Sequence, residues 1–153
     1  MWGGKQLYAF KYDNGTVTLT TNADKYTWYV PFRCRPIRAG VTVTTVLDGA
    51  ATVKFDRVPT PGSASGRGDG DCGMITIPTT TAAGKVYYDK TNYYYGIDPS
   101  STTAGNWCEL LDEGESVVFE LTSAATSGAA TPWLIVEIDS EQPGNNSNMT
   151  LTA

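Results

Sequence analysis

The chain has 153 residues, of which 41% are hydrophobic and 18% are charged, enough apolar material for one independently folding domain. Its formal net charge is −5, which disfavours nucleic-acid binding, and it contains no histidine. Without histidine, Ser-His-Asp and Cys-His nucleophile systems and imidazole metal sites are excluded.

Charge is unevenly distributed along the chain. Residues 1–60 carry eight Lys/Arg against four Asp/Glu, whereas residues 61–153 carry three against twelve. We interpret this as two differently charged surfaces of one domain. The alternative is docking between copies of the chain or onto a charged lattice.

Near the N-terminus, residues 6–12 alternate between apolar and polar side chains and predict a strand with three aromatic residues on one side: Tyr8, Phe10 and Tyr12. Asn14-Gly15 follows, and residues 16–20 alternate again. Because Asn-Gly supplies the positive φ angles of a tight turn, the two segments are predicted to form a hairpin.

The next aromatic segment, 26–32, predicts a strand that is ended by Pro31 and Pro36. Residues 41–47 (Val-Thr-Val-Thr-Thr-Val-Leu) form the purest strand signal in the chain. Asp48-Gly49 then leads into residues 51–57, and this pattern predicts a second hairpin.

Residues 59–73 are expected to form a long Gly-rich loop. Within it, Arg67-Gly68-Asp69 matches the integrin-binding tripeptide, and Asp69 and Asp71 could offer carboxylates to calcium. The preferred interpretation of both is a run of turn-forming residues.

Residues 74–78 predict a short strand with Ile75 and Ile77 inward, followed by a turn at 79–84 and tyrosine-rich strands at 85–90 and 93–97. The densest group of aromatic residues lies in and after these two strands: Tyr87, Tyr88, Tyr93, Tyr94, Tyr95 and Trp107. We interpret the group as core on one face and subunit interface on the other; the alternative is stacking on sugar rings.

The C-terminal part predicts an acidic turn at 111–115 and then a strand with three apolar residues on one face: Val117, Phe119 and Leu121. Residues 123–131 are expected to be a loop. The last strand, 132–139, has one apolar face made of Leu134, Val136 and Ile138, and Trp133 and Ile135 on the other face. Such a strand is either central in its sheet or covered by another subunit.

Any two acidic residues might face each other across a cleft as paired catalytic carboxylates, and the candidates are Asp112, Glu113, Glu115 and Glu120. We interpret them as solvated charges on the turn and strand. The three cysteines, Cys34, Cys72 and Cys108, have no metal-like spacing, and free thiols are expected; a single Cys72–Cys108 bridge is the alternative.

Nine or ten short strands at regular spacing, with no convincing helix and no sequence repeat, predict an all-β sandwich or barrel. Jelly-roll and immunoglobulin-like strand orders both fit these segments. Residues 1–139 are expected to form one domain and residues 140–153 a C-terminal tail or arm. No secretory signal or membrane-spanning run is recognised, so folding in a reducing cytoplasm is expected.

One stretch resembles the C-terminal half of small β-sandwich virion proteins of tailed bacteriophages. It consists of the turn Leu111-Asp-Glu-Gly-Glu115, the strand Val117-Val-Phe-Glu-Leu121, a loop rich in Ala, Thr and Gly, and Trp133-Leu-Ile-Val-Glu137. The resemblance covers residues 41–139. It lies in the general character of the sequence, a short all-β chain rich in Thr, Gly and Ala with few charges, and it contains no catalytic or binding motif.

The resemblance implies a jelly-roll-like antiparallel β-sandwich with long Gly-rich loops and extended termini, self-association as a homotrimer, and a structural role on a virion assembled in the host cytoplasm. A capsid decoration (cement) protein would bind the major capsid protein through residues 1–11 or the tail after Glu141. No enzymatic activity, cofactor, metal, nucleic acid or membrane is expected. The alternative is a head-fibre, tail or receptor-proximal virion protein that contacts carbohydrate.

Overall fold

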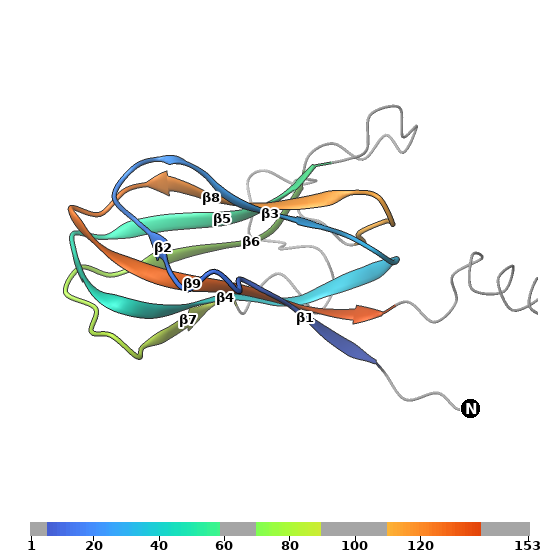
Figure 1. The fold of residues 1–153 in the computed structure, drawn as a ribbon, viewed down its shortest axis with the longest axis horizontal. Helices are drawn as coiled ribbons and strands as arrows, with labels where there is room; N and C mark the ends of the chain where they lie inside the picture. The colour runs from blue at the N-terminus through green and yellow to red at the C-terminus, as the bar shows by residue number, and fades with distance from the viewer. Residues whose placement is uncertain (1–5, 59–69, 90–109, 139–153) are drawn as a thin grey trace, which may run out of the picture.

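The computed structural model describes residues 6–58, 70–89 and 110–138, which form an antiparallel β-sandwich of two layers (Figure 1). Within these residues there are nine strands and no helix. Sheet A contains, in spatial order, β1 (Leu7–Lys11) and β2 (Val17–Thr18) beside β9 (Ser127–Ile138), then β4 (Cys34–Asp48) and β7 (Val86–Tyr88). Sheet B contains β3 (Ala23–Tyr29), β8 (Ser116–Ser123), β5 (Ala51–Val58) and β6 (Gly70–Ile77).

The strands nearest the two ends of the sequence pair with each other, and those closer to its middle pair in turn. β1 and β2 pair with β9, β3 pairs with β8, β4 with β7, and β5 with β6, all antiparallel. A long hairpin nested in this way and rolled into two sheets is a jelly roll. This topology separates the fold from the immunoglobulin-like sandwich, which does not nest its strands.

The core lies between the two sheets and is built by period-two alternation. Val117, Phe119 and Leu121 of β8 are buried, as predicted, and so are Val53 and Phe55 of β5. Leu134 and Val136 of β9 meet them from sheet A. Because both inner faces are aliphatic and aromatic, burial of this surface is the main force that holds the layers together.

The predicted N-terminal hairpin is wrong, although both of its strands are present. β1 and β2 do not pair with each other; both pair antiparallel with β9, one after the other, and therefore run in the same direction. Gly15 has a φ of 90°, but the bend that it makes only interrupts one edge of sheet A. β9 is long enough to pair with both segments. This long-range pairing, and not the local turn, determines where the two segments lie.

The predicted hairpin at Asp48-Gly49 is also wrong. Gly49 does adopt a φ of 85°, but the turn leads from β4 in sheet A to β5 in sheet B. The buried faces of the two strands therefore oppose each other across the core instead of lying side by side. Each strand finds its ladder partners elsewhere, β4 with β9 and β5 with β8 and β6.

Three predicted boundaries differ from the structure because ladder pairing extends strands into weakly patterned sequence. Pro36 lies inside β4, next to a register shift between Pro36 and Arg38, where a missing N–H is tolerated. Residues 70–73 belong to β6 and not to the loop predicted at 59–73. Residues 127–131 belong to β9, not to the loop predicted at 123–131.

β9 is an interior strand of sheet A, which agrees with the first of the two interpretations of its apolar faces. The predicted strand at 93–97 and the tail at 140–153 lie outside the described residues. No helix of the described chain is long and apolar enough to cross a membrane.

Candidate interaction surfaces

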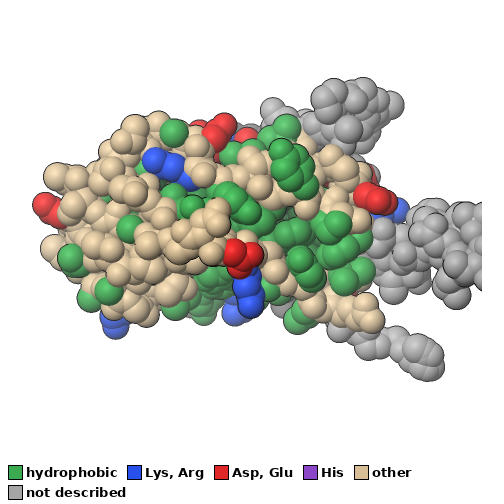
Figure 2. Space-filling model, in the orientation of Figure 1, with side chains coloured by type: hydrophobic (Ala, Val, Ile, Leu, Met, Phe, Trp, Pro, Cys, Tyr) green, Lys and Arg blue, Asp and Glu red, His purple; other side chains and the backbone are tan. Residues whose placement is uncertain are grey.

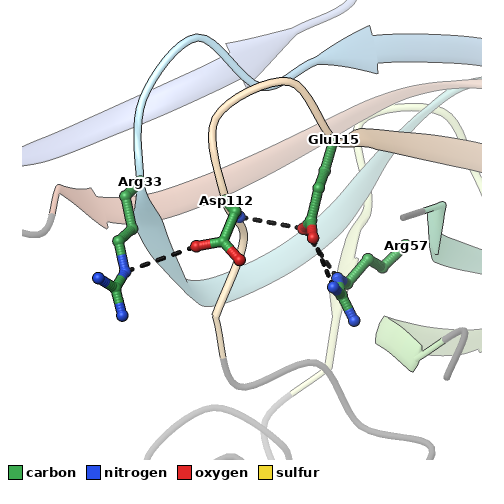
Figure 3. A network of polar contacts seen from close by, with 4 residues as sticks. All are labelled: Arg33, Arg57, Asp112 and Glu115. Carbon is green, nitrogen blue, oxygen red and sulfur yellow. Dashed lines mark hydrogen bonds and ion pairs between the residues drawn. The ribbon is translucent and has the colours of Figure 1, made fainter. Parts of the chain in front are cut away.

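The acidic turn before β8 holds a buried ion pair at one end of the sandwich (Figure 3). Arg57, near the end of β5, donates from Nε to Glu115 Oε2 at 2.8 Å and from Nη2 to Glu115 Oε1 at 2.5 Å. Both residues are only 2% exposed. The pair has the bidentate geometry in which a guanidinium satisfies both oxygens of a carboxylate.

Backbone hydrogen bonds lock this turn in place. The Asp112 N–H donates to Glu115 Oε2 at 3.0 Å, and the Gly114 N–H donates to the Val30 carbonyl beyond the end of β3. Arg33 Nε lies 3.6 Å from Asp112 Oδ1 at the outer side of the turn. Glu115 is thus held by side-chain and backbone donors, which makes it a structural anchor.

The four acidic candidates lie in different environments. Glu113 is exposed on the turn, as expected for a solvated charge, and Glu120 lies on the outer face of sheet B, 3.2 Å from Lys54 Nζ. Asp112 is half-buried. The interpretation as a solvated charge is wrong for Glu115, because alternation along the strand places it inside, opposite Arg57.

The remaining predicted sites are only partly covered by the structure. Arg67-Gly68-Asp69 lies outside the described residues, as does Cys108. Cys34 and Cys72 are buried in the core. Within the described parts of the chain, no group of three or more His, Cys, Asp or Glu side chains is placed to hold a metal ion.

The tyrosine-rich segment contributes two described aromatic residues with different environments. Tyr87 packs against the core, and its hydroxyl lies 3.4 Å from Thr81 Oγ1. Tyr88 is half-buried, and the Arg38 guanidinium lies 4.5 Å from the centroid of its ring. This is a cation–π contact. Tyr93, Tyr94, Tyr95 and Trp107 lie outside the described residues.

The outer face of sheet A carries a large aromatic side chain that the sequence did not single out as a site. Lys11, Trp133, Gly40 and Tyr88 stand in one row across β1, β9, β4 and β7. A Cβ atom on Gly40 would lie 2.0 Å from Trp133 Cζ2 and 2.4 Å from Cε2 and Cη2. The indole therefore covers Gly40 directly, and the absence of a side chain there makes this contact sterically allowed.

Beside the indole is an open cavity of about 370 Å³ at the interruption between β1 and β2. Its apolar part is formed by Ala9, Pro132, Trp133 and Ile135. Its polar part is formed by Lys11, Tyr12, Asp13 and Thr131. The cavity arises where the chain leaves β9 after Lys11 and returns at Val17, beside a proline that has no N–H for a ladder.

A second apolar surface lies on the side of the molecule where the two sheets meet at β1 and β3. Figure 2 shows hydrophobic side chains gathered there. We call it the aromatic edge. It is made of the exposed Tyr8, the half-buried Tyr12, Tyr26 and Phe32, and Phe10 buried beneath them. The rings of Tyr8, Phe10 and Phe32 lie in contact, as do those of Tyr12 and Tyr26, with centroid separations of 4.8–6.4 Å.

The outer face of sheet B is different in character. Lys54 contacts Glu120 and Asp56, and the Thr52 and Thr76 hydroxyls are 3.4 Å apart. Such a face interacts well with water. The aromatic edge and the outer face of sheet A are therefore the better candidates for binding. No protein-family model, curated protein or solved structure matches the chain.

Proposed function

We propose that this chain is a structural virion protein of a tailed bacteriophage, most directly a capsid decoration protein that binds and stabilises the head lattice. The observation that carries the proposal is the exposed apolar edge at β1. Leu7 and Tyr8 are 62% and 44% exposed on a strand that, among the described strands, pairs with β9 alone.

An apolar edge strand of this kind is a liability in a protein that stays monomeric. Its unpaired backbone groups and exposed apolar side chains favour association with another chain. A strand from a neighbouring protein added to β1 would satisfy the backbone and cover Leu7 and Tyr8. This supports residues 1–11, among the two arms expected from the sequence, as the segment that contacts the lattice or a second copy.

The rest of the molecule supports a binding role in a particle. The jelly roll is a fold that many viral structural proteins share, although a fold alone does not decide function. Its core is filled by interlocked side chains, and the buried Arg57–Glu115 pair stabilises one end. A stiff body repeated over a symmetric lattice gives strong total binding from weak individual contacts.

The test is co-sedimentation of the purified protein with heads assembled from the major capsid protein of the same genome. We expect saturable binding at hundreds of copies per head. The double variant Leu7→Ser/Tyr8→Ser should bind at least about tenfold more weakly, because its edge no longer buries apolar area. The control Val46→Ser/Met74→Ser removes similarly exposed apolar side chains elsewhere and should bind normally. Wild-type protein that remains in the supernatant would contradict the proposal.

A second candidate is a head-fibre, tail or receptor-proximal protein that contacts carbohydrate. It is favoured by the outer face of sheet A, where Trp133 covers Gly40 and Arg38 lies over Tyr88. Saturation at a dozen copies or fewer would favour this candidate, because such numbers fit a vertex or tail position and not a lattice.

A further inference from the structure

We propose that the cavity beside Trp133 is a binding site for a neutral hexopyranose unit of a glycan. The inference deepens the receptor-contact candidate and is independent of lattice binding, so the two can fail separately. It rests on three properties of the cavity: a flat aromatic wall, a rim with both signs of charge, and a rigid frame.

The flat wall comes from Trp133. The point where a Gly40 Cβ would lie is 2.0 Å from Cζ2, and the two ring atoms bonded to Cζ2 are only 0.4 Å farther away. That near-equality places the point above the ring plane and not in it. The indole therefore lies with one face covered by β4, so a ligand can reach only the opposite face of the ring, and Trp133 is among the residues that line the cavity. A pyranose ring has apolar C–H groups on its faces and can pack against such a large aromatic surface.

The polar residues at the rim of the cavity favour a ligand without net charge. Lys11 and Asp13 are exposed, and within the described residues neither side chain forms an ion pair. One ammonium and one carboxylate on the same cavity disfavour ligands with a net charge of either sign. They suit hydroxyl groups, each of which can donate to the carboxylate or accept from the ammonium.

The frame of the cavity is held in place by hydrogen bonds that are already present without a ligand. Thr131 Oγ1 donates to the Gly15 carbonyl at 2.8 Å and ties the bend between β1 and β2 to β9. The indole N–H of Trp28, in the core, donates to the Lys11 carbonyl at 2.9 Å. The rim is therefore positioned before any ligand arrives, which lowers the cost of binding.

The size of the cavity fits a small ligand. At about 370 Å³ it lies at the lower end of the range for small-molecule sites, which begins at roughly 300 Å³. The site is open on one side, so a pyranose would be held as one unit of a longer chain. We expect a dissociation constant of about 1 mM for a single unit, and tighter binding when several copies act together.

The experiment is a titration of ¹⁵N-labelled protein with methyl glycosides of glucose, galactose and mannose. We expect at least one glycoside to shift the indole N–H signal of Trp133 in a saturable way. Trp133→Ala should weaken binding by at least about tenfold. Lys11→Ala and Asp13→Ala, which change only exposed side chains, should each weaken it several-fold.

Tyr29→Ala is the matched control, because it removes a 78% exposed aromatic residue on β3 in sheet B. It should bind the glycoside like the wild-type protein. The proposal is overturned if no glycoside binds up to about 50 mM, far above the expected 1 mM. It is equally overturned if the rim variants bind normally, or if the Trp133 signal responds only to protein concentration, which would assign this face to a second copy.

Discussion

At the scale of single residues, Gly40 determines how the outer face of sheet A is built. Ala at this position would place its Cβ 2.0 Å from Trp133 Cζ2, far closer than van der Waals contact, so the indole has to move off β4. We expect Gly40→Ala to lower the free energy of unfolding by about 1–3 kcal/mol, the usual cost of overpacking. Acrylamide quenching of Trp fluorescence should increase as the ring becomes exposed.

The control for this change is the double variant Gly40→Ala/Trp133→Ala, in which the clash is absent. Its stability should be close to that of Trp133→Ala alone, which would give a large coupling energy in a double-mutant cycle. Additive effects would show that Gly40 and Trp133 do not contact each other as described.

The buried ion pair leads to a second prediction at this scale. Arg57→Leu leaves the Glu115 carboxylate buried without its guanidinium, and we expect a loss of about 3–5 kcal/mol in unfolding free energy, measured by urea denaturation. Arg57→Leu/Glu115→Gln should recover much of that loss, because Gln is neutral and still accepts from the Asp112 N–H. Equal stability of the single and double variants would contradict this account.

At the scale of elements, the position of each strand in its sheet should determine its exchange protection. Within sheet A, β9 and β4 pair on both sides, whereas among the described strands β1 and β2 pair with β9 alone, and β2 has two residues. Within this sheet, we expect the amides of β9 and β4 to exchange slowest with deuterium and those of β1 and β2 much faster. On binding to capsids, β1 should become protected. Equal protection of β1 and β9 in the free protein would argue against an open edge.

The strands themselves were largely predictable, and their partners were not. Val117, Phe119 and Leu121 alternate so regularly that their burial followed from the sequence alone. Asn14-Gly15 and Asp48-Gly49 favour tight turns, but a turn residue specifies only local backbone angles. Whether the next strand pairs with the previous one depends on long-range partners such as β9, which local pattern does not contain.

The candidate sites show the same limit. Trp133 was recognised as an outward-facing residue of a covered or central strand. The cavity beside it also needs Pro132, the bend at Asp13 and the gap between β1 and β2, which come together only through the register. Glu115 looked like one of several charges on a turn, because its partner Arg57 is 58 residues away.

At the scale of the whole molecule, the outer faces of the two sheets differ in chemistry. Sheet B presents paired charges and hydroxyls to water, whereas sheet A presents Trp133, Tyr88 and Arg38. The aromatic edge joins them along one side. A protein arranged in this way can attach through its edge and leave the outer face of sheet A accessible to a second ligand.

The nesting of the strands also bears on how the chain is synthesised. β1 and β3 emerge first, yet their partners β9 and β8 follow only after Ser116, and Gly15 is 116 residues from its hydrogen-bond partner Thr131. Neither sheet can close on the ribosome until those last strands appear. Contacts between residues so far apart in sequence make folding slow, and the aromatic edge stays exposed until folding is complete. Nascent chains should therefore depend on chaperones until translation of β9 is complete.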